Sequence, residues 1–420
     1  MDFLEMKRHT LHIIALLLTF SLAINAQESG VFVNNLKSMQ VKPNGEWDQP
    51  PVMLLARGQY MEITFDDLQH NFVRYTYRIT HCNSDWTRSD LLVSEYMDGF
   101  EENRLEDYEQ SMTTEMDYNH YRLTIPNDDV RLLVSGNYIV DIYGEDDEDE
   151  PVARACFSVV EPRVGIDISV SGNTDIDTYE SHQQVSFSIN YSGMQVKNPS
   201  SDFKPVVLQN RRWDNHVRDI MPTYMPINKL IYEHVNALIF DAGAEYRRFE
   251  ILDRHTPTMR VDRMQYDGDY YHAILFEDEQ RTAYFFDHDQ DGHYFVRHFD
   301  DDNNETESDY FYTHFSLKMP ALPGGDVYIN GELTNNRISE EYKMEYNLID
   351  HCYEIVLPLK QGAYNYQYLF VRDGETVGHT GPCEGNFHQT ENEYIIYVYY
   401  RDFGDRYDRL VGFQQIKTTL

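Results

Sequence analysis

Residues Tyr77–Phe100 read YRITHCNSDWTRSDLLVSEYMDGF. Polar and apolar side chains alternate along residues 73–82, which lead into this stretch. One set comprises Val73, Tyr75, Tyr77, Ile79 and His81, and the other comprises Arg74, Thr76, Arg78, Thr80 and Cys82. A period of two over that length predicts a half-buried strand. Asn83–Asp85 is a turn-forming cluster, and Trp86 returns the chain to an apolar environment. The stretch therefore predicts a strand, a tight turn and a tryptophan anchor in a β-sandwich.

His81 and Cys82 have the residue types of a catalytic base and its nucleophile. Adjacent residues of a strand point to opposite faces of the sheet. Their side chains therefore cannot form the mutual hydrogen bond that nucleophilic catalysis requires. No other feature of the sequence supplies either residue with a partner, so we interpret the pair as architecture and predict no catalytic residue.

The composition favours β structure throughout. Aromatic residues make up 14% of the chain, hydrophobic residues make up 41%, and tyrosine occurs 33 times. Tyr and Phe favour pleated, half-buried surfaces, and short strands separated by turns are typical of immunoglobulin-like sandwiches. We predict an all-β chain of tandem immunoglobulin-like or E-set-like β-sandwich domains.

The net charge excludes two classes of partner. The chain has 71 acidic and 35 basic residues, and its formal charge is −36. Such a charge repels nucleic acids and anionic membrane surfaces. We therefore expect no nucleic-acid partner.

The N-terminus has the pattern of a secretory signal. Lys7 and Arg8 precede the apolar run Leu11–Leu22, which is too short to span a bilayer. Cleavage is predicted after Ala26, which makes Gln27 the first mature residue. No later stretch approaches the roughly 20 apolar residues of a membrane helix, so we expect a soluble, exported protein that does not itself span the membrane.

We expect three domains after the signal peptide of residues 1–26. The first is an N-terminal β-sandwich over 27–162, which ends at the predicted joint Glu161–Arg163 because proline ends a strand. A middle β-rich region over 163–320 is long enough for one or two sandwiches. The third is a C-terminal sandwich over 321–420.

The four cysteines fall into an early pair and a late pair. They are Cys82, Cys156, Cys352 and Cys383. One disulfide in each end domain is compatible with an oxidising compartment, and four buried free thiols are the alternative. The spacing does not choose between the two.

One motif is typical of calcium loops. Asp287–Gly292 reads DHDQDG, and carboxylates at the alternate positions Asp287, Asp289 and Asp291 could converge on one cation. The position of the expected bidentate glutamate is His298, however, and the flanks alternate as strands do. A hairpin turn at Asp-Gly explains the same residues, so both interpretations stand.

Motifs of the common enzyme classes are absent from the sequence. It contains no Gly-x-Ser-x-Gly, no His-Glu-x-x-His, no glycine-rich phosphate loop and no dinucleotide fingerprint. Carboxylate pairs are uninformative in so acidic a chain. We expect a protein that is not an enzyme.

The segments Tyr77–Trp86 and Glu95–Phe100 closely resemble the plug protein family of the type IX secretion system. Further matching segments are YRLTIP at 121–126, LVSGNY at 133–138, EYRRF at 245–249, VYINGELTN at 327–335, QGAYNYQY at 361–368 and YDRL at 407–410. The resemblance extends over almost the whole mature chain.

This resemblance implies a periplasmic β protein that is peripherally associated with the outer membrane. Members of the family dock on the periplasmic opening of the large outer-membrane translocon barrel and seal it when no substrate is in transit. The resemblance implies neither catalysis nor a cofactor. Since loops on rigid sandwiches carry function, we expect Met97, Asp98, Gly99 and Phe100 to contact the barrel.

The C-terminal region also resembles carbohydrate-binding sandwiches, through Val327–Asn336. An exported carbohydrate-binding protein is therefore the alternative function. Aromatic residues Tyr364, Tyr366 and Tyr368 could stack on sugars if they are exposed, although such stripes in strands are more often core. Asn336 stands near the position where such modules often carry a tryptophan, and asparagine cannot stack.

Overall fold

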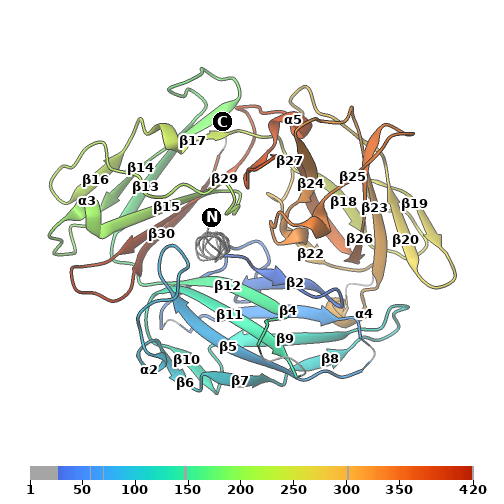
Figure 1. Cartoon of the computed structure of the whole chain (residues 1–420), viewed down its shortest axis with the longest axis horizontal. Coiled ribbons are helices and arrows are strands. Elements are labelled where there is room, and N and C mark those ends of the chain that lie inside the picture. Colours follow the sequence, from blue (N-terminus) through green and yellow to red (C-terminus); the bar gives the residue numbers. More distant parts are fainter. Residues whose placement is uncertain (1–26, 57, 70, 146–148, 300–301, 419–420) are drawn as a thin grey trace, which may run out of the picture.

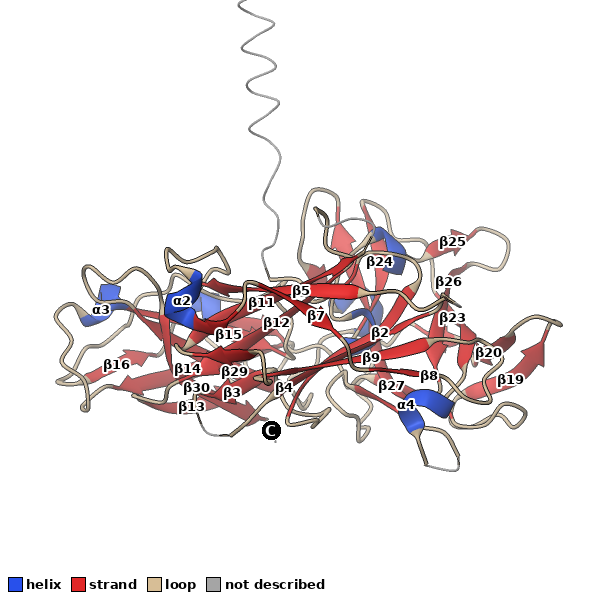
Figure 2. Cartoon of the chain, turned by 90° about the horizontal axis from the view of Figure 1, so that it is seen from below, coloured by secondary structure: helices blue, strands red, loops and turns tan. Residues whose placement is uncertain are grey.

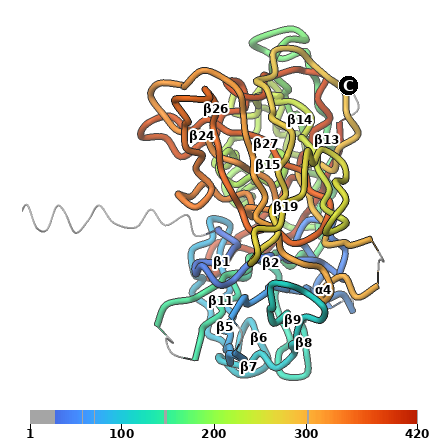
Figure 3. The backbone as a smooth tube through the Cα atoms, turned by 90° about the vertical axis from the view of Figure 1, so that its right-hand side faces the viewer, coloured from blue at the N-terminus to red at the C-terminus, as the bar shows by residue number. Residues whose placement is uncertain are grey.

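Three lobes of β-sheet surround a common centre in the computed structural model (Figure 1). The structure describes residues 27–56, 58–69, 71–145, 149–299 and 302–418. The predicted signal peptide lies outside the described residues. In a side view the first lobe, blue to teal, lies below the other two (Figure 3). The all-β class predicted from the sequence is confirmed.

The described helices are short and lie between strands (Figure 2). The α-helices are α2 (Val93–Tyr96), α3 (Pro199–Asp202), α4 (Asn304–Glu307) and α5 (Gly381–Glu384). The 3-10 turns are η1 (Asn236–Leu238), η2 (Glu332–Thr334) and η3 (Glu340–Tyr342).

The first lobe is a sandwich of two mainly antiparallel sheets with one small ribbon. One sheet has the order β1 (Gly30–Val31), β12 (Ala153–Val160), β11 (Gly136–Gly144), β5 (Tyr75–Cys82) and β7 (Glu102–Leu105), with β3 (Val52–Leu54) parallel to β12. The other has the order β2 (Leu36–Pro43), β4 (Met61–Asp67), β9 (Asn119–Ile125) and β8 (Tyr108–Gln110). The ribbon pairs β6 (Met97–Gly99) with β10 (Val130–Leu132). Large side chains such as Phe65, Tyr77 and Tyr138 fill the core between the sheets.

The second lobe packs two sheets that come from distant parts of the chain. One contains β13 (Gly165–Ser171), β14 (His182–Asn190), β16 (Lys229–Tyr232) and β17 (Ile239–Asp241). The other contains β15 (Phe203–Gln209), β29 (Glu393–Tyr400) and β30 (Arg409–Lys417). Phe187 and Tyr232 of the first sheet share a core with Ile396 and Val398 of the second.

The third lobe is built around the long strand β27 (Gly362–Arg372), which is buried along nearly its whole length. Strands β18 (Arg247–Ile251), β22 (Tyr294–Val296), β24 (Gly325–Asn330) and β28 (Gly378–His379) pair with it. The facing sheet contains β19 (Val261–Tyr266), β20 (Tyr271–Leu275), β21 (Asp278–Glu279), β23 (Tyr310–Lys318), β25 (Glu345–Asn347) and β26 (Cys352–Lys360). Phe249, Phe315 and Tyr366 belong to the core between these sheets.

Strand pairing crosses the boundary predicted near residue 320. Strand β15 pairs with β29, β18 pairs with β27, and β23 pairs with β26. Residues 164–241 and 393–417 together build the second lobe, and the third lobe lies between them in the sequence. The ranges 163–320 and 321–420 are therefore not separate packing units, because each holds strands whose partners lie in the other.

A buried ionic cluster joins the first lobe to the third. The ammonium of Lys360 lies 2.7 Å from Asp66 Oδ2, and both side chains are 1% exposed. The Tyr310 hydroxyl donates to the same carboxylate at 2.6 Å, and His120 Nδ1 lies 2.6 Å from its other oxygen. Every oxygen of the buried Asp66 carboxylate thus has a partner, as a buried charge requires.

Hydrogen bonds also join the first lobe to the second. The buried Asp408 carboxylate accepts from the Ser84 hydroxyl at 2.7 Å and from Lys204 at 2.8 Å. The Tyr399 hydroxyl donates to Asn137 Oδ1 at 2.8 Å. The turn that follows β5 is therefore part of a contact between lobes.

Candidate functional site

The predicted contact segment Met97–Phe100 is only partly at the surface. Met97 is 1% exposed because it lies in the first-lobe core, whereas Phe100 is 76% exposed. Asp98 is exposed and its carboxylate lies 2.8 Å from the Arg131 guanidinium on β10. The side chains that remain available to a partner are thus Phe100 and the Asp98–Arg131 ion pair.

The backbone at Gly99 has a shape that only glycine adopts easily. Its φ is +141°, and a Cβ atom there would lie 2.1 Å from the carbonyl oxygen of Asp129. The pairing of β6 with β10 brings these two segments together. Glycine is therefore required for this close approach, and it fixes the direction in which Phe100 leaves the ribbon.

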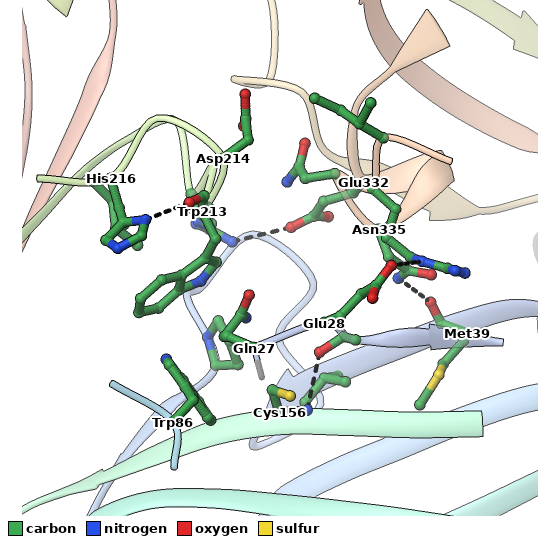
Figure 4. A pocket seen from close by; sticks show the side chains of 18 of the residues that line it. Gln27, Glu28, Met39, Trp86, Cys156, Trp213, Asp214, His216, Glu332 and Asn335 are labelled. Atoms are coloured by element: carbon green, nitrogen blue, oxygen red, sulfur yellow. Dashed lines mark hydrogen bonds and ion pairs between the residues drawn. The ribbon is translucent and has the colours of Figure 1, made fainter. Parts of the chain in front are cut away.

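A cavity of about 590 Å³ lies where the three lobes meet (Figure 4). All three tryptophans of the chain, Trp47, Trp86 and Trp213, line it. Trp86 of the first lobe and Trp213 of the second make an edge-to-face contact with ring centroids 5.5 Å apart. Trp47 contacts Phe295 of the third lobe, with ring centroids 4.8 Å apart. The tryptophans thus mark the junction of the lobes.

Ion pairs between residues of different lobes line this cavity. Glu28, one of the first described residues, lies 2.7 Å from Arg337 of the third lobe. Arg211 of the second lobe lies 3.3 Å from Glu332 of the third. Burial raises the pKa of the Cys156 thiol to about 12, so this residue is not an activated nucleophile. The cavity resembles a polar joint more than a reaction centre.

His81 and Cys82 point to opposite faces of β5, as predicted. His81 is fully buried, with Nδ1 2.8 Å from Ser89 Oγ and Nε2 3.2 Å from the Ser135 carbonyl oxygen. Burial lowers the pKa of His81 to about 4. On the other face, Cys82 packs with Trp86, and burial raises the pKa of its thiol. Neither group is poised for acid–base or nucleophilic chemistry.

All four cysteines are buried free thiols. Cys82 on β5 and Cys156 on β12 share one apolar cluster, but β11 lies between their strands. Two strand spacings place their backbones about 10 Å apart, and a disulfide spans at most about 7 Å. A bridge between these two residues would need the sheet to rearrange.

The three aspartates of the calcium motif have separate partners. Asp287 lies 2.6 Å from the Arg248 guanidinium, and Asp291 lies 2.6 Å from the Lys417 ammonium. Asp289 accepts from the backbone N–H of Tyr246, and burial raises its pKa to about 7. Within the described residues, no group of three His, Cys, Asp or Glu side chains is arranged as metal ligands.

The motif forms a tight turn instead. The His293 N–H donates to the Gln290 carbonyl at 3.0 Å, and Asp291 and Gly292 both have positive φ, +52° and +87°. This is the type I′ geometry that Asp-Gly favours.

The tyrosine stripe of the third lobe is core. Tyr364, Tyr366 and Tyr368 are at most 1% exposed, so they cannot stack on a soluble sugar. Asn336 lies at the central cavity with a left-handed backbone. The feature that favoured carbohydrate binding is therefore absent from the surface.

A family model described as the first domain of the type 9 secretion system plug protein matches residues 36–161. The chain belongs to the type IX secretion system plug protein family. The match spans nearly all of the first lobe, including the turn after β5 and the β6–β10 ribbon.

One solved structure resembles almost the entire plug-family chain. It is a hypothetical protein from Parabacteroides merdae, 47% identical, with a TM-score of 0.91, covering 93% of this chain and 99% of its own. An enterococcal surface protein aligns with a TM-score of 0.20 and 7% identity, which is too low to indicate a shared fold. No curated protein matches. In the part of the plug-family chain that the structure describes, no helix has the length and apolarity to cross a membrane.

The central cavity could not be predicted from the sequence. Its lining comes from segments between Gln27 and Tyr397, and such a site has no local pattern. The only available clue was the distribution of three tryptophans over the chain. Similarly, the burial of Met97 depends on pairing with β10, which lies about 30 residues further along.

Proposed function

We propose that this plug-family chain closes the periplasmic opening of the type IX outer-membrane translocon barrel when the barrel is idle. The family match over residues 36–161 carries the proposal. We place the protein in the periplasm, peripherally associated with the outer membrane after removal of a signal peptide. The role needs no catalysis, and the buried state of His81 and Cys82 is consistent with a protein that is not an enzyme.

The first lobe would contribute a mixed contact surface to this docking. Phe100 offers an exposed apolar ring, and the neighbouring Asp98–Arg131 pair is also exposed. An apolar centre with a polar rim is typical of partners that bind reversibly. Reversibility is what a seal that opens for each substrate requires.

The charge of the chain suggests how the plug is guided to its partner. A formal charge of −36 would speed association with a basic rim around the opening and would make binding sensitive to salt.

Co-purification from detergent-solubilised outer membranes tests the proposal. We expect the native plug to recover a large β-barrel, with less barrel at high salt. Recovery of the plug without any large barrel at every salt concentration would refute the proposed function. A deletion strain should also admit large antibiotics when substrate traffic is low.

The variant Phe100→Ala tests the predicted contact. Removing an exposed aromatic anchor should lower barrel recovery about tenfold, as truncation of an interface hot spot does. Phe285→Ala is the matched control, because Phe285 is 71% exposed on the third lobe. Equal recovery by Phe100→Ala and the wild type would remove Phe100 from the contact surface.

A further inference from the structure

A second exposed segment differs chemically from the rest of the surface. Residues Ile220–Asn228 read IMPTYMPIN and contain no charged side chain, although 25% of the whole chain is charged. The segment belongs to the connection between β15 and β16. Strand β16 lies at the outer end of the second lobe, away from the other two lobes (Figure 1).

Four large apolar side chains of this segment project into solvent. The exposed fractions are 64% for Met221, 55% for Tyr224, 63% for Met225 and 93% for Ile227. All four fall within seven consecutive residues of one loop. Large apolar side chains gathered on the surface of an otherwise charged protein mark an interaction site.

The backbone of the segment is held in place. The Thr223 N–H donates to the Ile231 carbonyl at 2.8 Å, and the Ile231 N–H donates to the Tyr224 carbonyl at 2.9 Å. Pro222 and Pro226 further restrict the chain. The apolar side chains are therefore presented by a preformed loop, which reduces the entropy lost on binding.

The surrounding charges favour a protein partner over a lipid surface. Arg218 lies 3.0 Å from Asp219, and Lys229 lies 3.9 Å from Asp167, so each flanking cation is beside an anion. Segments that insert into anionic membranes carry an excess of Lys and Arg. The formal charge of −36 opposes such membranes further.

We propose that residues 220–228 are a second docking point, whose Met221, Tyr224, Met225 and Ile227 side chains enter an apolar recess of the translocon barrel. This inference rests on the function proposed above. Methionine adapts to irregular apolar surfaces, and tyrosine is enriched at the centres of protein interfaces. The segment belongs to a different lobe from Phe100, so two lobes would hold the plug on its partner.

The double variant Met225→Ser/Ile227→Ser tests the inference in the same co-purification with the full chain. We expect it to recover at least about tenfold less barrel than the wild type. The matched control is Leu348→Ser/Ile349→Ser, because these residues are 79% and 86% exposed on the third lobe. Both double variants should retain wild-type thermal melting, since the replaced side chains are exposed.

The outcomes separate this inference from the proposed function. If the wild type recovers no barrel, the proposed function fails and the docking point fails with it. If the wild type and Met225→Ser/Ile227→Ser recover equal amounts, only the docking point is refuted. A third arm incubates each protein with vesicles of phosphatidylethanolamine and phosphatidylglycerol. Vesicle binding by the wild type that the double variant loses would overturn the choice of a protein partner.

Discussion

Lys360 and Asp66 form the most completely buried ion pair between lobes, with both side chains 1% exposed. Burial alone would raise the pKa of Asp66, but the Lys360 ammonium and His120 outweigh it and hold that pKa below its usual value. Burial lowers the pKa of the Lys360 ammonium, although the Asp66 carboxylate opposes that shift, so each charge of the pair depends on the other. Its contribution lies in fixing the first lobe against the third.

Lys360→Met should destabilise the protein strongly. Removal of one member leaves the Asp66 carboxylate buried without its cation, which costs about 3–5 kcal/mol in the free energy of unfolding. Lys318→Met is the control, because Lys318 and Glu277 are a half-exposed pair 3.8 Å apart, and its loss should cost less than about 1 kcal/mol. Urea denaturation measures both values. Similar values for the two variants would contradict this account.

His81 should make the protein less stable in acid. Its pKa falls from 6.5 to about 4 on folding, so between these values the unfolded state binds the extra proton. The neutral, buried His81 therefore lowers stability only in acid. The free energy of unfolding is unaffected by His81 protonation above pH 6.5, and it falls by about 3 kcal/mol in total as the pH falls toward 4.

A His81→Asn variant isolates this effect. Asp289, with a pKa raised to about 7, affects stability in the opposite direction over much of the same pH range. Its carboxyl group keeps the proton in the folded protein, so its contribution to the free energy of unfolding increases as the pH falls. The informative quantity is therefore the difference in unfolding free energy between wild type and variant at each pH. A difference that stays constant from pH 7 to pH 4 would argue against a neutral buried His81.

At the scale of elements, the second lobe depends on strands that arrive late in the sequence. Strand β29 lies between β15 and β30, and β27 has partners on both sides of residue 320. A fragment of residues 321–420 would leave β27 without β18 and β22, and β29 without β15. We expect the isolated fragment to lack dispersed amide signals in a nuclear magnetic resonance spectrum, and a well-dispersed spectrum would show that it folds alone.

The same strands show what local sequence could predict. Alternation over residues 73–82 predicted a strand, and β5 spans Tyr75–Cys82, because burial of one sheet face imposes a period of two. Nothing local specified that β15 pairs with β29, since register is fixed by short turns only within hairpins. The contact segment Met97–Phe100 was predicted as a loop because its pairing with a distant strand also has no local signal. Its Met97 became core only through β10.

For the whole molecule, the three tryptophans report on the junction of the lobes. The third lobe lies within the sequence of the second, and Lys360 ties it to the first, so we expect the lobes to separate only as they unfold. Tryptophan emission and far-ultraviolet circular dichroism should therefore give coincident urea transitions. A red shift of the emission at lower urea would mean that the lobes part while still folded.

The discontinuity of the second lobe has a consequence for the order of folding. Gln183 and Tyr394 share a 2.9 Å hydrogen bond although they are 211 residues apart. A chain made from its N-terminus can close the first lobe early, but β15 must wait until β29 has emerged. Meanwhile the unpaired strand edges of the half-built lobe are open to association with other chains. This lobe is therefore where a holding chaperone would be needed during biogenesis.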